Sequence, residues 1–260
     1  MKMKIGISGI NGRVGRVLKS LIVENPDQYK DINLVFGLAR YAASDLTLDV
    51  TDDADTFFDG VDGVIDFSLP DNFVRLAELN CDKYGKFMVS GTTGMDAAQM
   101  DAIEVAAQHV PILHAGNMSL GVNLLCALVR QSAARLGVEY DIEIAETHHR
   151  MKRDAPSGTA LMLGRAAADG REVAHDDVAV FGRHGADVLR KEGEIGYAVQ
   201  RGGGVIGAHD VSFFGGSEEL TLSHKALDRA LFAEGAIFAA RWLKDKPAGR
   251  LYSMQDALEI

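Results

Sequence analysis

The chain has 260 residues, 47% hydrophobic and 25% charged, an ordinary composition for a folded protein with room for one large domain or two modest ones. Its formal net charge of -10 argues against a general nucleic-acid or anionic-membrane surface, so a local basic cluster would suit a small anion. We interpret the two cysteines, Cys81 and Cys126, as buried reduced thiols of a cytoplasmic protein, because they form no CxxC and no metal-ligand spacing. The sequence also shows no signal-peptide pattern and no run of 18 apolar residues.

Short apolar runs alternate with helical stretches through the first half of the chain. The apolar runs predict buried strands at residues 4–8, 33–37, 63–68, 87–90 and 110–114. Between them, the pattern predicts helices at residues 12–24, 72–84 and 95–108. Strands and helices in alternation are typical of an α/β protein with a doubly wound parallel sheet, whose ligands bind at the carboxyl ends of the strands.

The pattern changes near residue 118, where we expect a domain boundary. Residues 119–136 predict one long apolar helix. Strands then follow in succession, separated by glycine clusters, at residues 141–147, 194–200, 205–214 and 219–224. Successive strands predict a second, α+β domain with an open mixed or antiparallel sheet. Residues 226–244 return to a helical pattern.

A glycine-rich turn with the spacing GxxGxxG follows the first predicted strand, at Gly9, Gly12 and Gly15. Glycine lets the backbone approach a diphosphate, and the helix that follows offers unpaired N–H groups and a partial positive charge. The spacing differs from the standard GxGxxG, so the alternative is an ordinary strand–helix turn. Its place after the first strand of an alternating pattern favours a dinucleotide site.

The end of the second strand is where an adenosine ribose would be recognised. An acidic residue there suits the hydroxyls of NAD, whereas an arginine suits the 2′-phosphate of NADP. The sequence reads Gly37-Leu38-Ala39-Arg40, with no acid at this point. Arg40 therefore indicates that NADPH is preferred to NADH, and the alternative is that Arg40 is an exposed loop residue.

Imidazole and positive charge gather in residues 146–160, ETHHRMKRDAPSGTA. His148 and His149 end an alternating strand, so their side chains should point to opposite faces. Histidine suits proton transfer near neutral pH, and Lys152 suits a carboxylate partner or, with a lowered pKa, an acid. The alternative is a basic surface loop.

A helix start follows this basic run. Ser157 is a good N-cap after a proline, and the backbone N–H groups of Ser157, Gly158 and Thr159 can hold a carboxylate. The alternative here is a capped helix without a ligand.

With these motifs in view, the sequence resembles the dihydrodipicolinate reductase family of lysine biosynthesis over nearly its whole length. The residues that carry the resemblance are GINGRVGR at 9–16, IDFSLP at 65–70, SGTTG at 90–94, GNMSLGVN at 116–123, ETHHRMKRDAPSGTA at 146–160, EIGYAVQRGGGVIGAHDVSFF at 194–214 and SHKALDRALFAEGA at 223–236. The stretch 146–160 is the most diagnostic, because the histidine pair, the lysine and SGT occur in the family's order and spacing.

The resemblance implies a Rossmann-like domain at residues 1–118 and 230–260 that binds NADPH or NADH. It implies a second domain at residues 119–229 that binds substrate and builds a homotetramer. The activity implied is reduction of (hydroxy-)dihydrodipicolinate to tetrahydrodipicolinate in the diaminopimelate route. The substrate is a cyclic imine with two carboxylates, so an acidic protein would need a local cationic pocket to capture it.

Site residues follow from the same match. His148 corresponds to the catalytic acid/base, His149 to a substrate contact, Lys152 to a second proton donor, and Gly158 with Thr159 to the carboxylate-binding turn. The implied cofactor contacts are Gly9, Ile10, Asn11, Gly12, Arg13, Val14, Gly91, Thr92, Thr93, Ala115, Gly116, Asn117, Met118, Arg229 and Phe232. No metal is expected.

Two departures from the family pattern bear on these expectations. Ala39 stands where the family often has an acid, which puts dual use of NADH and NADPH in doubt. Met151 stands where many members have another histidine, so this position is not expected to be essential.

Two other classes of protein fit parts of the sequence. Another two-domain NADP oxidoreductase, of the aspartate-semialdehyde or homoserine type, would act on a carbonyl. The former needs a nucleophilic cysteine, and Cys81 and Cys126 both lie in predicted helices. A non-enzymatic NADP sensor has no need of a proton donor beside a carboxylate site.

Overall fold

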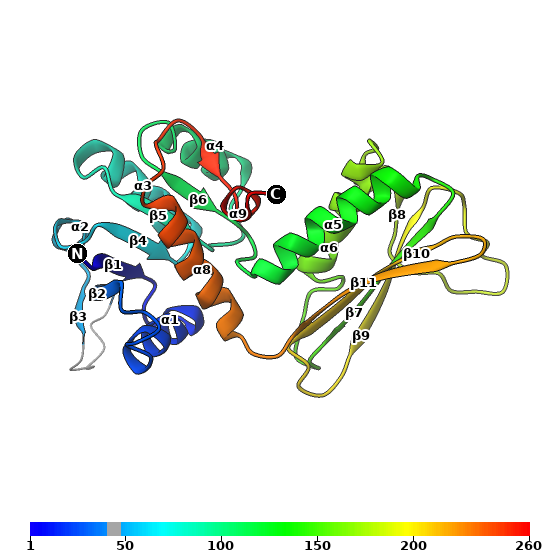
Figure 1. The fold of residues 1–260 in the computed structure, drawn as a ribbon, viewed down its shortest axis with the longest axis horizontal. Helices are drawn as coiled ribbons and strands as arrows, with labels where there is room; N and C mark the ends of the chain where they lie inside the picture. The colour runs from blue at the N-terminus through cyan, green and yellow to red at the C-terminus, as the bar shows by residue number, and fades with distance from the viewer. Residues whose placement is uncertain (41–47) are drawn as a thin grey trace. The chain divides into compact units, whose positions relative to one another are not determined.

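The computed structural model describes residues 1–40 and 48–260, which divide into two compact units (Figure 1). The first unit comprises Met1–Leu120 and Ala230–Glu259, and the second comprises Gly121–Arg229 with Ile260. The first division between the units falls between residues 120 and 121, two residues after the domain boundary predicted between residues 118 and 119. Within the described ranges, no helix is long and apolar enough to span a membrane, and no cluster of three or more metal-ligating side chains occurs.

The first unit is built on a seven-stranded sheet with the order β12-β6-β5-β4-β1-β2-β3, in which every neighbouring pair is parallel. Its strands are β1 (Met3–Ser8), β2 (Ile32–Leu38), β3 (Asp49–Thr51), β4 (Gly63–Asp66), β5 (Phe87–Ser90), β6 (Ile112–His114) and β12 (Leu251–Tyr252). Apart from β12, this order is that of a dinucleotide-binding fold, and it reverses beside β1, where such folds bind their ligands. The predicted doubly wound parallel sheet is confirmed.

Helices cover both faces of this sheet. They are α1 (Arg13–Glu24), α2 (Ala54–Asp59), α3 (Pro70–Lys83), α4 (Ala97–Ala106), α8 (Ala230–Leu243) and α9 (Met254–Leu258). Neighbouring residues of a strand enter different apolar clusters: Val64 packs with α2, α3 and α4, whereas Ile65 packs with α1, α8 and α9. This alternation explains why the strands read as continuous apolar runs.

The second unit has a mixed sheet with the order β11-β10-β7-β9-β8. Its strands are β7 (Asp141–His148), β8 (Ala179–Val180), β9 (Ile195–Arg201), β10 (Gly207–Phe214) and β11 (Glu219–Ala226). β10 runs antiparallel to both β7 and β11, whereas β7 and β8 run parallel to β9, so the predicted mixed sheet is confirmed.

Helices α5 (Leu120–Leu136) and α6 (Gly158–Gly170) share one apolar cluster with this sheet, and α7 (His175–Val178) is a short helix after them (Figure 1). Along β7, Ile142 and Ile144 are fully buried in that cluster, and Glu146 and His148 follow them on the same face. The face that buries the core therefore also carries the first polar residues of the site.

Several sequence predictions differ from the structure, most of them at the ends of helices and strands. The predicted helix at 226–244 begins only at Ala230, because β11 pairs with β10 as far as Ala226. The strand predicted from residue 205 begins at Gly207. Cys81 is half-buried, not buried, since it lies at the edge of the contact between α3 and α4.

Candidate active site

The glycine-rich turn joins β1 to α1 through backbone that only glycine can adopt. Gly9 has φ of +78°, and a Cβ there would lie 2.4 Å from the carbonyl oxygen of Phe67. Gly12 caps α1 without a side-chain hydrogen bond, and its N–H donates to the carbonyl of Gly9 at 2.8 Å. The start of α1 is thus bare backbone, which fits the diphosphate of a dinucleotide.

A cleft of about 500 Å³ opens beside this turn. Its lining includes Gly9, Asn11 and Gly12 of the turn, and the charged residues Arg40, Asp52 and Arg75. Among the described lining residues, two guanidinium groups and one carboxylate give a net charge of one positive, which suits an additional phosphate. Arg40 was predicted, whereas Arg75 and Asp52 were not.

A buried carboxylate organises the turn after β5. Asp66 is fully buried, and it accepts hydrogen bonds from the hydroxyls of Ser68 (2.7 Å), Ser90 (3.0 Å) and Thr92 (2.7 Å). Nε2 of His114 donates to the carbonyl of Thr92 at 2.9 Å, and burial lowers the pKa of His114, so this ring is neutral. The hydroxyl of Thr92 is committed to Asp66, and the N–H groups of Gly91 and Thr92 donate to the carbonyl of Asp66 and the hydroxyl of Ser90, so these groups hold the turn in place.

The other predicted cofactor contacts have varied exposure. Met118 is buried, and its carbonyl packs so closely on α8 that a Cβ at Gly235 would lie 1.7 Å from the oxygen. The remaining residues are Arg13, Thr93, Gly116 and Arg229, which are exposed, Val14, Gly91, Ala115 and Phe232, which are half-buried, and Ile10 and Asn117, which are buried.

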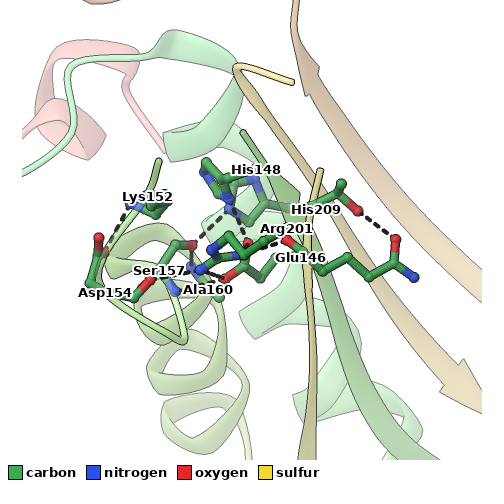
Figure 2. A network of polar contacts seen from close by, with 10 residues as sticks. Glu146, His148, Lys152, Asp154, Ser157, Ala160, Arg201 and His209 are labelled. Atoms are coloured by element: carbon green, nitrogen blue, oxygen red, sulfur yellow. Dashed lines mark hydrogen bonds and ion pairs between the residues drawn. The ribbon is translucent and has the colours of Figure 1, made fainter. Parts of the chain in front are cut away.

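A dense polar cluster lies at the carboxyl end of β7 in the second unit (Figure 2). Glu146 is 1% exposed, and each of its carboxylate oxygens accepts a hydrogen bond of 2.8 Å from Arg201 of β9. Oε2 also lies 2.5 Å from Nδ1 of His148, and Oε1 accepts the N–H of Ser157 at 3.0 Å. Four donors therefore surround one buried carboxylate.

These contacts fix the charge of Glu146 and the tautomer of His148. Burial raises the pKa of Glu146, but the hydrogen bonds from Arg201, His148 and Ser157 outweigh it and hold the pKa below its usual range. An ionised carboxylate only accepts hydrogen bonds, so Nδ1 of His148 carries a proton, and in the neutral ring Nε2 carries none. Burial lowers the pKa of His148, and the hydrogen bond to Glu146 opposes that shift.

Nε2 is therefore the ring atom of His148 that can exchange a proton with a ligand. It lies 3.0 Å from the position that a Cβ of Gly207 would occupy, and no hydrogen bond joins it to any residue in the described ranges. His209 of β10 packs edge-on against the ring, with 5.1 Å between the centroids. Burial, followed by the charge of His148, lowers the pKa of His209 to about 4, so its ring is neutral.

Lys152 lies in the loop between β7 and α6. Its Nζ forms an ion pair of 2.9 Å with Oδ2 of Asp154, and Arg201 donates a hydrogen bond of 2.7 Å to the backbone carbonyl of Asp154 (Figure 2). His149, the other predicted substrate contact, follows the last residue of β7 and is half-buried. The structure thus brings His148 and Lys152 to the same end of one strand.

Ser157 caps α6 as predicted, since its Oγ accepts the N–H of Ala160 at 3.1 Å. Its Oγ is also hydrogen-bonded to Nε2 of His209 at 3.0 Å, and the residue is 1% exposed. The expectation that the Ser157 N–H faces a substrate carboxylate is corrected: that donor is already bonded to Glu146. Gly158 is exposed and Thr159 is half-buried. As the first two residues of α6, they stay candidates for binding the substrate carboxylate.

No role was predicted from the sequence for Glu146, Arg201 or His209. The sequence does contain an indication for Glu146: it lies on the same face of the strand as Ile142 and Ile144, which are buried. A carboxylate on a buried face needs a hydrogen-bonding or charged partner. Arg201 and His209 join it only through strand pairing, in which His209 lies opposite Glu146.

Neither cysteine has the environment of a nucleophile. Burial raises the pKa of the Cys126 thiol to about 11, and burial, aided by nearby carboxylates, also raises that of Cys81. Both are protonated at neutral pH, which argues against the aspartate-semialdehyde type of enzyme.

Comparison with known proteins identifies the family. The family model described as "Dihydrodipicolinate reductase, N-terminus" matches residues 3–118, and "Dihydrodipicolinate reductase, C-terminus" matches residues 121–258. The chain belongs to the dihydrodipicolinate reductase family. It is therefore an oxidoreductase, and its relatives catalyse the dihydrodipicolinate reduction step of lysine and diaminopimelate biosynthesis. The family expected from the sequence is confirmed.

Individual relatives match over almost their whole length. The 4-hydroxy-tetrahydrodipicolinate reductase of Caulobacter vibrioides is 48% identical, over 98% of this chain and 97% of the relative. That of Parvibaculum lavamentivorans is 46% identical, over 99% and 98%. A solved structure, dipicolinate-bound dihydrodipicolinate reductase from Paenisporosarcina sp. TG-14, shares the fold with a TM-score of 0.80 and 21% identity, over 98% of this chain and 99% of that one.

Proposed function

We propose that this reductase converts (hydroxy-)dihydrodipicolinate to tetrahydrodipicolinate with His148 as the proton donor. The observation that carries the proposal is the buried pair of Glu146 and His148. The pair has a fixed tautomer, and Nε2 of the imidazole has no partner among the described residues. A sensor that only binds a nucleotide has no use for such a group.

Proton transfer is the step that the second unit performs. A reduced nicotinamide, when bound, supplies the hydride. Addition of the hydride leaves negative charge on the conjugated ring, and His148 can neutralise it by donating a proton from Nε2. Because burial lowers its pKa, His148 is mostly neutral without ligand. Two substrate carboxylates beside the ring would favour its protonated form, which couples proton uptake to substrate binding.

In this proposal, Lys152 and the start of α6 bind the carboxylates of the substrate. Lys152 is 21% exposed, so its ammonium group can reach a ligand while its stem stays packed. Gly158 and Thr159 are the first two residues of the helix, where the dipole and the backbone donors favour an anion. His149 is close in sequence and only half-buried, which supports a substrate contact.

For the cofactor, we propose a pyridine nucleotide bound in the first unit, with NADPH preferred to NADH. The bare start of α1 supports the diphosphate site, and Arg40 and Arg75 support recognition of the 2′-phosphate. Asp52 lines the same cleft, and its negative charge would repel the 2′-phosphate. The positive charges of Arg40 and Arg75 together exceed that single negative charge.

We further propose that the second unit carries the contacts of a homotetramer. The face of its sheet opposite α5 and α6 supports this assignment. That face holds the exposed side chains of Ala145, Ala198 and Phe214, on three neighbouring strands.

The test follows the absorbance of NADPH, with substrate made in situ by the synthase that precedes this enzyme. His148→Gln should lower kcat by roughly 10²–10⁴-fold, because general acid catalysis accelerates a reaction by about that factor. The affinity for NADPH should be unchanged. Lys152→Ala should raise KM for the substrate and lower kcat, since it removes a charge from the ground state and the transition state. His184→Gln, in an exposed loop of the same unit, is the matched control.

The outcomes separate the alternatives. NADPH binding without any oxidation by wild type would support the sensor and refute the reductase. A loss of kcat smaller than about tenfold in His148→Gln would exclude His148 as the acid and leave Lys152 as the donor.

A further inference from the structure

Asp154 lies among the same groups that are proposed to bind a substrate carboxylate. Its Oδ2 lies 2.9 Å from Nζ of Lys152, and the two side chains are 58% and 21% exposed (Figure 2). Its pKa is held below the usual range: burial acts to raise it, but the hydrogen bond from Lys152, the backbone N–H of Asp154 itself, the charge of Lys152 and, least, the backbone N–H of Gly158 outweigh that effect. A carboxylate of the chain itself thus pairs with Lys152, three residues before the N-cap of α6.

The backbone of Asp154 is fixed independently of its side chain. Arg201 donates a hydrogen bond of 2.7 Å to the carbonyl of Asp154 through the same Nη2 that binds Glu146. The carboxylate is more than half exposed, so it can turn into water by rotation of its own side chain while this anchor stays in place. Exposed ion pairs of this kind contribute little free energy, which makes the exchange readily reversible.

We propose that Asp154 is a substrate-mimicking latch, an internal carboxylate that occupies the anion site of Lys152 and α6 until a carboxylate of the substrate displaces it. This inference rests on the proposed function, because it identifies that anion site with the substrate site. The latch keeps the ammonium group of Lys152 paired and in position when the site holds no ligand. It also weakens every anionic ligand of this site by the free energy needed to displace Asp154.

The decisive perturbation is Asp154→Asn, which keeps the size of the side chain and removes its charge. Asparagine competes less well for an ammonium group, so pyridine-2,6-dicarboxylate should bind about 2- to 10-fold more tightly, the range expected for an exposed ion pair with a helix-terminus contribution. The Asp154→Ala variant should bind pyridine-2,6-dicarboxylate at least as tightly as the Asp154→Asn variant does. The KM for substrate should fall in both variants while kcat is unchanged, because the latch is already displaced in the bound state.

Two controls isolate the effect. Asp187→Asn removes the same charge from an exposed loop of the second unit and should leave the dissociation constant unchanged. In a Lys152→Met background, Asp154→Asn should give a smaller improvement than in wild type, because the two residues act through one ion pair.

Isothermal titration calorimetry with pyridine-2,6-dicarboxylate gives the dissociation constants without any turnover. Tighter binding to Asp154→Asn, reduced in the Lys152→Met background, supports the latch. Unchanged or weaker binding overturns it and assigns to Asp154 no role or a positioning role. Failure of wild type itself to bind the dicarboxylate and to reduce the substrate would instead refute the proposed function.

Discussion

The carboxylate of Glu146 allows a direct test of how the site holds its histidine, through the substitution Glu146→Gln. Oε2 accepts hydrogen bonds from Arg201 and His148, and Oε1 accepts them from Arg201 and Ser157. A glutamine amide has only one oxygen, so its NH₂ group must face two of these four donors in either orientation. The variant therefore keeps the shape of the side chain and leaves at least two hydrogen bonds unmade.

The loss should appear in stability. Removing one partner of a buried ion pair costs about 3–5 kcal/mol in unfolding free energy, because the other charge stays buried. Arg201 is 19% exposed and keeps hydrogen bonds to the carbonyls of Gln200 and Asp154, so we expect a loss near the lower end of that range. Urea unfolding of wild type and variant measures it.

Catalysis should change with a defined sign. Glu146 raises the pKa of His148 against the lowering by burial, so removal of its charge should lower that pKa further. Protonated His148 would then be rarer at neutral pH, and the orientation of its ring would be less fixed. We expect kcat to fall by roughly 10²–10⁴-fold. In the plot of kcat/KM against pH, the decline that marks the deprotonation of His148 should move to lower pH.

Glu143→Gln is the matched control. Glu143 lies on the same strand but on the opposite face, where it accepts hydrogen bonds from Arg183 and Arg190. It should cost stability and leave the pH profile of kcat/KM unchanged. A folded Glu146→Gln enzyme with kcat within about tenfold of wild type and an unshifted pH profile would refute the role of Glu146 in holding the acid.

Two further predictions concern the cofactor and the pH dependence of folding. Arg40→Ala should raise KM for NADPH by about tenfold and KM for NADH much less, since a charge-assisted hydrogen bond contributes about 1.5–3 kcal/mol; equal effects on both cofactors would contradict this. Burial lowers the pKa of His209 to about 4 from an ordinary 6.5, so the unfolded chain binds more protons between these values and stability falls as pH decreases from 6.5 to 4. His209→Asn should remove roughly 3 kcal/mol of that dependence, measured by urea unfolding at a series of pH values, and an unaltered dependence would exclude a buried neutral ring.

Long periodic elements of the fold could be predicted from the sequence, and short ones could not. The parallel strands are buried on both faces and read as apolar runs, so their places and the doubly wound class followed from the pattern. β3, β12, α2 and α9 span from two to six residues, too few for any period to show. The helix predicted from residue 226 began late because the pairing of β11 with β10, a long-range contact, overrides local propensity.

The site divides in a similar way. Residues that stand together in one motif, such as His148, Lys152 and Ser157, could be named from the sequence. Their connections could not be inferred, because Arg201 and His209 reach Glu146 through the registers of β9 and β10 against β7. The error about the Ser157 N–H has another cause: the path of the loop between β7 and α6 brings this donor to Glu146, whereas the local sequence predicts an unpaired N–H at a helix start.

In the proposed mechanism, the charges of the second unit's site stay balanced through the binding step. Without ligand, the two cations Lys152 and Arg201 face the two carboxylates Glu146 and Asp154, and His148 is mostly neutral because burial lowers its pKa. A substrate that brings two carboxylates would leave an excess of negative charge in a partly desolvated site, which is costly. Departure of Asp154 into water and protonation of His148 each offset one of those charges. The lowered pKa of His148 is then an advantage for an acid: the proton arrives with the substrate, at Nε2, when the ring to be reduced is in place to receive it.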